Sequence, residues 1–590
     1  MGATLYRLKR FSRKRGSVLL ALLIITIFVC QFTSLSKLTH DHISTLQKSF
    51  QTQQQTSLNT VQESADPDDK TVPFYKSAAA KKPEKASQDK VSHLEKLKQI
   101  SLSMEDDHSG SRLIMGHELF DNVFEILKKG EPSIPKLERY KTDERIYHAG
   151  YDGDSSVVFT EEYLNGFLDL NTEEVSSLKK SHEYVVNNLP KDVPPQLYNG
   201  NGIVYVGGGK FNWLALLSIK SLRSLGSTLP VEVLIPTEDE YEIELCSRIF
   251  PALDAKCILL PHALGEKAMS KFSFKGYQYK ALALIVSSFE NVLLLDSDNI
   301  PVHAPDYLFD NEPFKSAGLI TWPDFWRRAT SPHYYTIAGI DVTKDRVRFG
   351  YDDREKDQEE TPFHDRKGAI PDPTSESGQL MISKSSHTKE LFLALYYNLY
   401  GPDYYYPLFS QGSDGEGDKE TFLAATVALG SSYYQVKKFL NAFGHFNIDH
   451  EFVGTGMGQY DPVEDFSIEK TKQRQKKVAQ ELNQDIELVG KEPRILFVHA
   501  NFPKLNPVSL KAENKVFERN GDRLRLYGPG MAKRVGYDFE LVQWRNMHFL
   551  VCELKIEVEA FNGQDYQTVC TEILDQLHHL EATVKDNERD

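Results

Sequence analysis

The most informative segment of the chain is Asn291-Val-Leu-Leu-Leu-Asp-Ser-Asp-Asn-Ile-Pro301. Its apolar run, residues 292–295, is short, continuous and followed at once by turn-forming residues, which predicts a fully buried strand. The strand ends in two aspartates one residue apart, Asp296 and Asp298. In an open α/β sheet, ligands bind in the crevice beyond the carboxyl ends of the strands, so we expect both carboxylates to lie there. A pair of hard oxygen ligands suits Mg²⁺ or Mn²⁺ bridging to substrate phosphates.

The two aspartates also have a simpler interpretation. The tripeptide Asp-x-Asp occurs by chance in many chains, and aspartates that follow a strand often do no more than form the turn. The surrounding sequence therefore has to decide between a turn and a metal site.

Strands and helices alternate on both sides of residues 291–301. Short apolar runs bounded by turn residues predict the strands, and apolar residues at helical spacing predict the helices. The expected strands are 203–206, 231–235, 257–260, 292–295, 318–322, 379–383 and 495–498. The expected helices are 211–225, 239–250, 278–289, 386–399 and 419–429. This alternation predicts an α/β fold with a mixed, mainly parallel sheet and right-handed crossovers.

Length and charge set the broad organisation. The chain has 590 residues, more than one hydrophobic core usually holds, so we expect one or two folded domains with appendages. Its net charge of -15 is spread along the chain, which argues against nucleic-acid binding, because neutralising phosphates needs a basic surface. We expect a helical part over 113–199, a catalytic core over 200–507 and a C-terminal extension over 508–590.

The N-terminus has the pattern of a membrane anchor. Residues 17–32 carry no charge, and extension to residue 35 gives close to the ~20 residues that span a bilayer. Basic residues between positions 9 and 15 predict a cytosolic start and a lumenal remainder. A cleaved signal peptide is the alternative, but the run exceeds the usual ~7–15 residues and no small-x-small site follows. We expect a cytosolic tail (1–15), a signal anchor (16–35) and a stem (36–112) too poor in apolar residues to fold.

Cysteine usage agrees with a lumenal location. Apart from Cys30 in the apolar run, the chain has an even number of cysteines that could form two disulfides, namely Cys246, Cys257, Cys552 and Cys570. No Cys-x-x-Cys pair occurs, which argues against a structural zinc site.

A glycine-rich loop, consisting of Val206, Gly207, Gly208 and Gly209, joins the first strand of the core to its helix. Glycines let a backbone approach a nucleotide closely, and a following helix N-terminus favours anionic groups. The loop matches neither the dinucleotide fingerprint nor the phosphate loop of ATPases. A plain tight turn explains it equally well.

Other candidate site residues follow later elements. His499 comes directly after a strand and could complete a metal shell with Asp296 and Asp298, although a structural histidine would look the same. Lys504 could offset diphosphate charge. Asp418 precedes a helix, where it could act as the N-cap or could bind an acceptor hydroxyl or serve as a base.

Two aromatic blocks, residues 322–328 and 404–406, offer ring faces that suit sugars. The same rings could equally pack in the core.

Together these segments resemble the fungal Golgi α-1,2-mannosyltransferases that branch the outer chain of N-linked mannan, in the same superfamily as the fungal α-1,3-mannosyltransferases. The resemblance covers residues 114–507 together with the tail, anchor and stem. The segments that carry it are 198–209, 294–301, 318–328, 376–379, 404–409, 415–419 and 497–501. One departure is Ser297, where alanine often stands between the aspartates.

The resemblance implies a GT-A-type fold, GDP-mannose as the donor, Mn²⁺ or another divalent cation, and an α-linked product formed with retention. Asp296, Asp298 and His499 would hold the metal. The other implied roles are diphosphate contacts by Lys280 and Lys504, nucleotide contacts by Val206, Gly207, Gly208 and Gly209, and contacts to the transferred sugar and the acceptor by Gln379 and Asp418. The implied partners are a mannan or N-glycan acceptor, the Golgi membrane through the N-terminal helix, and a Golgi complex with other mannosyltransferases.

Three alternatives stay open. The same fold could form an α-1,3 linkage or use another nucleotide sugar. A metal-dependent phosphohydrolase would usually need a denser cluster of histidine and aspartate ligands. A catalytically silent Golgi scaffold would have no need of Asp296, Asp298 and His499. For the transferase, no nucleophile is evident, which favours front-face attack by the acceptor hydroxyl over a covalent intermediate.

Overall fold

The computed structural model describes residues 110–143, 146, 157–350, 360–482 and 491–585. The expected tail, the expected anchor and the stem up to residue 109 lie outside these residues. Within the described residues, no helix is both long and apolar enough to cross a bilayer.

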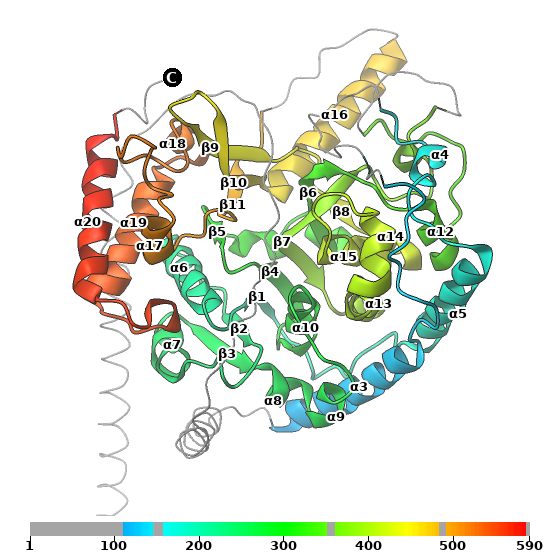
Figure 1. Cartoon of the computed structure of the whole chain (residues 1–590). Helices are drawn as coiled ribbons and strands as arrows, with labels where there is room; N and C mark the ends of the chain where they lie inside the picture. Colours follow the sequence, from blue (N-terminus) through cyan, green and yellow to red (C-terminus); the bar gives the residue numbers. More distant parts are fainter. Residues whose placement is uncertain (1–109, 144–145, 147–156, 351–359, 483–490, 586–590) are drawn as a thin grey trace, which may run out of the picture.

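A seven-stranded sheet forms the centre of the molecule, with the strand order β3-β2-β1-β4-β7-β6-β8 (Figure 1). Neighbouring strands from β3 to β4 run parallel, as do β6 and β8, whereas β7 is antiparallel to both β4 and β6. The strands are β1 (Asn201–Val206), β2 (Val231–Ile235), β3 (Ala255–Leu259), β4 (Asn291–Leu295), β6 (Leu319–Arg327), β7 (Pro373–Ser383) and β8 (Tyr434–Gln435). The predicted mixed, mainly parallel α/β sheet is therefore confirmed.

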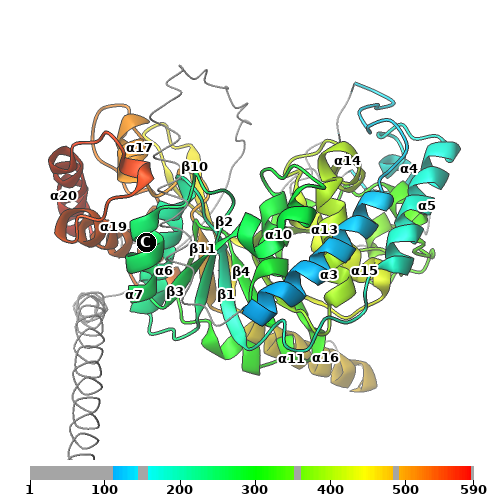
Figure 2. The same ribbon diagram turned by 90° about the horizontal axis from the view of Figure 1, so that it is seen from below.

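The central strand β4 shows why its apolar run is continuous. Leu293 and Leu295 pack into one hydrophobic core, and Val292 and Leu294 pack into a second core on the opposite face. Figure 2 shows α6 on one face of the sheet and α10 and α13 on the other. The covering helices are α6 (Phe211–Ser224), α10 (Gln278–Val286), α13 (Thr388–Leu399) and α15 (Thr421–Leu429). Because both faces are covered, every position of the strand interior favours an apolar residue.

A second sheet has the order β5-β11-β10-β9, and all its pairs are antiparallel. It is formed by β5 (Asn299–Pro301), β9 (Asn441–Phe446), β10 (Phe452–Tyr460) and β11 (Ile495–His499). The predicted strand 495–498 belongs to this sheet. Its glycine-rich neighbour β10 gave no strand signal in the sequence, which is why the second sheet was not expected.

One predicted helix begins later than expected. Of residues 239–250, the first four are not helical, and the remaining eight form a helix that includes the π-helical turn Leu245–Ile249 and runs into α7 (Phe250–Ala252). The start of the segment is held as a turn because Asn212 Nδ2 donates a hydrogen bond to the Glu240 carbonyl oxygen over 3.2 Å. The other core helices begin and end within three residues of their expected bounds.

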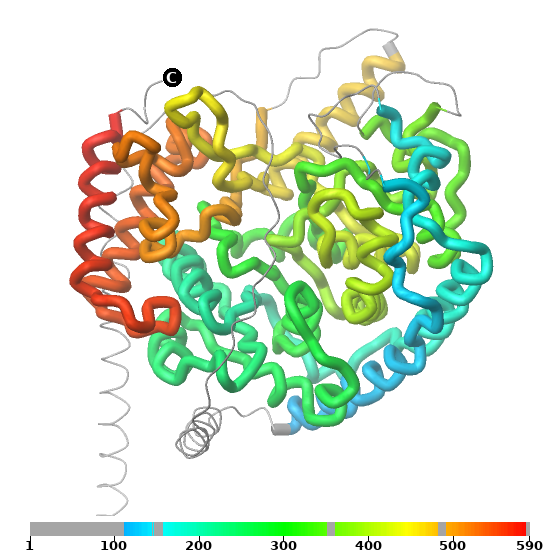
Figure 3. The backbone as a smooth tube through the Cα atoms, in the orientation of Figure 1, coloured from blue at the N-terminus to red at the C-terminus, as the bar shows by residue number. Residues whose placement is uncertain are grey.

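Helices from both ends of the described chain flank the core. On one side lie α3 (Gly110–Lys129), α5 (Thr172–Asn188) and α12 (Pro332–Ala338). On the other side, α19 (Phe539–His548) packs against α6, and α20 (Tyr566–Ala582), the red helix at the outer edge in Figure 3, packs against α19. Trp213 of α6 donates its indole N–H to the Leu505 carbonyl oxygen, and its ring packs 4.7 Å from that of Phe561. Residues beyond 508 thus share a core with the sheet.

The four cysteines after Cys30 form two disulfides. Cys246 is bonded to Cys257, which ties the short π-helical turn to β3. Cys552 is bonded to Cys570, which ties the π-helical turn Phe549–Glu553, directly after α19, to α20. The expected even pairing is confirmed.

Candidate functional site

The turn after β4 brings the predicted metal ligands together. Asp296 N–H donates to the Gly378 carbonyl oxygen over 2.8 Å, and Asn299 N–H donates to the Asp296 carbonyl oxygen over 2.9 Å. The chain then enters β5, where Asn299 pairs with His499 of β11. Two sheets therefore meet at this turn, and the pairing of β5 with β11 places His499 beside the two aspartates.

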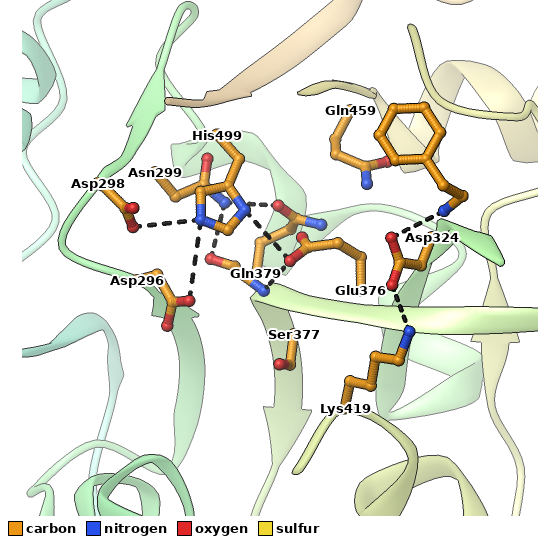
Figure 4. A network of polar contacts seen from close by, with 12 residues as sticks. Asp296, Asp298, Asn299, Asp324, Glu376, Ser377, Gln379, Lys419, Gln459 and His499 are labelled. Atoms are coloured by element: carbon orange, nitrogen blue, oxygen red, sulfur yellow. Dashed lines mark hydrogen bonds and ion pairs between the residues drawn. The ribbon is translucent and has the colours of Figure 1, made fainter. Parts of the chain in front are cut away.

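Asp296, Asp298 and His499 form a compact group of oxygen and nitrogen ligands. One ligand atom from each lies within 4.8 Å of the others. His499 Nε2 is 3.2 Å from Asp298 Oδ1 and 3.9 Å from Asp296 Oδ2 (Figure 4). Asp298 and His499 are buried, and Asp296 is half-buried. The structure thus assembles all three predicted ligands from two sheets.

Glu376 of β7 also contacts His499, a contact that sequence reasoning missed. Its Oε1 lies 3.2 Å from His499 Nδ1, on the far side of the ring from Asp298 (Figure 4). The same oxygen accepts a hydrogen bond of 2.6 Å from Gly378 N–H. A carboxylate on the second ring nitrogen fixes the orientation of a metal-binding histidine. The one signal in the sequence that could have indicated this role is the position of Glu376, a charged residue within an otherwise uncharged segment that forms β7.

Two lysines lie against the aspartates. Lys280 Nζ is 2.9 Å from Asp296 Oδ2 and 3.8 Å from Asp418 Oδ2, and it donates to Ser377 Oγ over 3.0 Å. Lys504 Nζ pairs with Asp298 Oδ2. Each lysine that was predicted to contact a diphosphate therefore stands beside a predicted metal ligand, where its charge offsets that of the carboxylate.

The pKa values in the cluster reflect burial opposed by close charges. Burial raises the pKa of Asp296 above its usual value, and Lys280 and His499 only partly offset this effect. Burial acts in the same direction on Asp298, but His499 and Lys504 together hold its pKa well below the usual range. Burial lowers the pKa of His499, yet Asp298 and Glu376 outweigh it and raise that pKa to about 10. Without a metal, the ring is therefore an imidazolium.

Asp418 lies next to this cluster but not as a helix cap. It begins a short 3-10 turn, Asp418–Glu420, and the N-cap position of α15 is Glu420, so the N-cap interpretation is wrong. Its Oδ1 accepts a hydrogen bond of 3.2 Å from Ser377 Oγ. Burial raises the pKa of Asp418 to about 6 despite the opposing charge of Lys280.

Gln379, expected near the transferred sugar, lies behind the ligands. Its side chain has no exposed surface, and its Oε1 accepts a hydrogen bond of 2.5 Å from Asn299 Nδ2. Asn299 also donates to the Gly378 carbonyl oxygen over 2.7 Å. This buried amide pair joins β7 to β5 beneath the metal ligands.

The glycine-rich loop Val206–Gly209 lies at the same edge of the sheet, at the end of β1. Gly208 has φ +96° and Gly209 has φ +52°, conformations that favour glycine. Gly208 N–H donates to Asn212 Oδ1 over 2.8 Å, and Gly207 N–H donates to the Leu234 carbonyl oxygen over 2.8 Å. The loop is thus a fixed turn at the edge where nucleotides bind in α/β sheets.

The aromatic blocks belong mostly to the core. Trp322 has no exposed surface, and its ring packs 5.8 Å from that of Phe497. Tyr405 and Tyr406 are buried as well, whereas Trp326 is half-buried. The core interpretation therefore holds for most of these rings.

The cluster has the donors that a divalent cation needs. Carboxylate oxygens suit Mg²⁺ and Mn²⁺, and Mn²⁺ also accepts an imidazole nitrogen. Two further buried carboxylate oxygens, Glu376 Oε2 and Asp418 Oδ2, have no hydrogen-bond partner among the described residues. The excess of negative charge favours a cation, and binding it at His499 Nε2 requires loss of the ring's second proton. Asp296, Asp298 and His499 therefore fit a resident Mn²⁺.

Comparison with known proteins identifies relatives over most of the chain. A family model described as a putative mannosyltransferase matches residues 200–461. The α-1,2-mannosyltransferase MNN21 of Candida albicans is 53% identical over 80% of this chain and 76% of its own length. The α-1,2-mannosyltransferase MNN2 of Saccharomyces cerevisiae is 39% identical over 81% of this chain and 87% of its own length. Among solved structures, the glycosyltransferase GlyE of Streptococcus pneumoniae aligns over 64% of both chains with a TM-score of 0.28 and 12% identity, a likeness too low to support an argument.

Proposed function

The chain belongs to the fungal α-1,2-mannosyltransferase family, and from this premise we propose that it transfers mannose from GDP-mannose to branch positions on an α-1,6-linked mannan. The mannose would be added in α-1,2 linkage with retention of configuration. The core that contains both sheets would be a GT-A-type fold.

One observation carries this proposal: Asp296, Asp298 and His499 converge at the carboxyl end of the central strand, beside the glycine-rich loop. In α/β sheets this edge is where ligands bind. Two carboxylates and one imidazole supply three ligands and leave coordination positions for diphosphate oxygens. The arrangement favours transfer from a nucleoside diphosphate sugar over a binding-only role.

Each side chain of the cluster has a task in this reaction. A divalent cation, when bound, stabilises the negative charge that develops on the departing diphosphate. Glu376 orients the His499 ring so that Nε2 faces the two aspartates. Lys280 and Lys504 lie beside those aspartates and supply ammonium donors for the diphosphate oxygens.

Asp418 would position the attacking hydroxyl. Its pKa of about 6 leaves it mostly ionised at neutral pH, so it can accept a hydrogen bond from the acceptor. It lies on the Lys280 side of the cluster, 3.8 Å from the lysine Nζ. An acceptor held there approaches the same face of the sugar that the diphosphate leaves, and such front-face attack retains the α configuration.

We propose further that the protein is a single-pass Golgi membrane protein with its catalytic domain in the lumen. The apolar run at residues 16–35 and the basic residues before it support an anchor of this orientation. The two disulfides also support it, because disulfides persist in the secretory pathway and are rare in the cytosol. Protease protection in sealed Golgi vesicles would test this: loss of a C-terminal tag without detergent would contradict a lumenal domain.

The experiment that tests the function uses the purified chain with Mn²⁺, GDP-mannose and an α-1,6-mannose oligomer. We expect transfer of mannose in α-1,2 linkage, shown by linkage analysis of the product. Chelation should abolish turnover, and added Mn²⁺ should restore it. An α-1,3 product, use of a UDP-sugar in place of GDP-mannose, or turnover that survives chelation would contradict the corresponding part of the proposal.

A further inference from the structure

A turn after β2 packs directly against the glycine-rich loop. Asn212 connects the two, because its Oδ1 accepts from Gly208 N–H over 2.8 Å and its Nδ2 donates to the Glu240 carbonyl oxygen over 3.2 Å. β1 and β2 are parallel neighbours, so the loop and the turn both lie at the carboxyl ends of their strands. The turn is therefore part of the edge at which the sheet would bind a nucleotide.

The carboxylate of Glu240 lies over the glycine-rich loop. A Cβ atom added to Gly208 would lie 3.2 Å from Glu240 Oε2, and one added to Gly209 would lie 3.8 Å from Glu240 Oε1. Nothing else lies within 4 Å of the position that a Gly209 Cβ would take. The two glycines thus let the loop backbone lie directly against the carboxylate, so that a ligand bound along the loop would also reach Glu240.

The carboxylate oxygens of Glu240 can accept more hydrogen bonds than they do within the protein. Its Oε2 accepts one hydrogen bond of 3.1 Å from Thr237 Oγ1. In the part of the chain that the structure describes, no lysine, arginine or histidine forms an ion pair with it, and its Oε1 has no hydrogen-bond partner. A half-buried carboxylate without a counter-charge is suited to a ligand that brings two N–H donors.

The same turn lies two strands away from the metal cluster, at the same edge of the sheet. β1 pairs in parallel with β2 on one side and with β4 on the other. The glycine-rich loop after β1 therefore lies between the turn that holds Glu240 and the aspartates that follow β4. A diphosphate at the metal ligands could extend its nucleoside along this edge towards Glu240.

We propose that Glu240 recognises the base of the donor by accepting hydrogen bonds from N1–H and the 2-amino group of guanine. This inference rests on the proposed function and names the group that selects GDP-mannose. Guanine presents two adjacent donors on this edge, which matches the two oxygens of a carboxylate. Uracil presents one N–H between two carbonyl oxygens, and adenine presents an amine beside an unprotonated nitrogen, so a carboxylate repels part of either edge.

The test compares inhibition of mannose transfer by GDP, inosine diphosphate and xanthosine diphosphate. Inosine lacks the 2-amino group, and xanthosine has a carbonyl oxygen in its place. For the unmodified chain, we expect GDP to inhibit at concentrations about tenfold or more below those of the other two, since a hydrogen bond to a charged group contributes about that factor.

The variant Glu240→Gln should shift the preference among these inhibitors from GDP towards xanthosine diphosphate. The glutamine Oε1 still accepts from N1–H, but its Nε2 donor opposes the guanine amine and suits the xanthine oxygen. GDP inhibition should weaken by about 10- to 100-fold, and xanthosine diphosphate inhibition should become stronger than in the unmodified chain. A variant that merely disturbed the fold would weaken both.

Glu238→Gln is the matched control, because it makes the same substitution two residues away in the same turn. It should leave all three inhibition constants unchanged. If Glu240→Gln keeps the order of the unmodified chain while GDP-mannose is still the donor, the assignment of Glu240 is wrong and the proposed function stands. If the unmodified chain prefers UDP to GDP, both are wrong.

Discussion

Two buried lysines lie at opposite ends of the central strand β4, and their surroundings differ. At the carboxyl end, Lys280 contacts Asp296 and Asp418. At the amino end, Lys384 follows the residue that pairs with Asn291, and its Nζ donates to Ser287 O and Oγ, each over 2.9 Å. The same Nζ lies 3.7 Å from the centre of the Tyr198 ring. One end of the strand is rich in carboxylates, and the other satisfies its lysine with neutral groups.

The same burial has opposite outcomes at the two ends. Burial alone lowers the pKa of either lysine, because it disfavours the charged form. Asp296 and Asp418 reverse this effect and raise the pKa of Lys280 above its usual value. Glu232 does not reverse it for Lys384, whose pKa lies well below the usual range. Burial of a charge therefore does not mark a functional site; a surplus of opposed charges at the ligand-binding edge does.

The largest effect should come from removing a carboxylate at the functional end. Asp298→Asn should lower mannose transfer by at least about 10²- to 10³-fold, because the charge that stabilises the departing diphosphate is no longer held in place. Steady-state kinetics with GDP-mannose measures this loss. Circular dichroism should show an unchanged fold. Activity within a few-fold of the unmodified chain would remove Asp298 from the metal site.

The two lysines offer a matched pair of substitutions. Lys280→Met should reduce kcat by about 10²-fold, because it removes a diphosphate donor and leaves Asp296 and Asp418 without their cation. Lys384→Met should change kcat by less than about threefold, since it lies at the far end of the strand. Equal losses of kcat in the two variants would show that the ends do not differ in the way we describe.

Glu376→Gln should have an intermediate effect. The amide can still contact His499 Nδ1 but without charge, so we expect Mn²⁺ affinity to fall by about 10- to 100-fold. The Mn²⁺ dependence of turnover measures this, and saturating Mn²⁺ should restore most of kcat. A loss of kcat that no Mn²⁺ concentration restores would indicate that Glu376 acts on the substrate directly.

The smallest effect concerns pH. If Asp418 must be ionised, kcat should fall by about tenfold per pH unit below pH 6. The free energy of unfolding depends on pH in the opposite direction to kcat. Between the usual value of 3.8 and about 6, the folded protein binds this proton more tightly than the unfolded chain, so stability falls as pH rises through that window. At neutral pH the ionised group costs about 3 kcal/mol.

The matched variant for the pH experiment is Asp418→Asn. At pH 7.5 this variant should unfold at a higher temperature than the unmodified chain. Its kcat should not show the fall below pH 6 that we expect for the unmodified chain. Stability that is lower in the variant at that pH would contradict the raised pKa.

Much of this site could be predicted from short-range signals. The apolar run of β4 is continuous because both faces of the sheet are covered, and its end identified Asp296 and Asp298. His499 was recognisable because it also directly follows an apolar strand. Both signals depend only on the order of residues within a few positions.

The contacts that the sequence did not reveal depend on pairing between distant segments. Glu376 reaches His499 because β7 pairs antiparallel with β4, over a separation of more than eighty residues. The second sheet joins β5 to β11 over nearly two hundred residues. Asp418 was ambiguous for a related reason: its carboxylate accepts a hydrogen bond from Ser377 of β7, a contact between segments about forty residues apart.

A calorimetric titration of Mn²⁺ into the purified chain in the presence of GDP tests the metal site most directly. We expect one Mn²⁺ to bind per chain, with proton release because His499 is an imidazolium before the metal binds. The Asp298→Asn variant should lose this binding. Binding of Mn²⁺ that is unchanged in Asp298→Asn, or no binding by the unmodified chain, would contradict the claim that Asp296, Asp298 and His499 form the metal site.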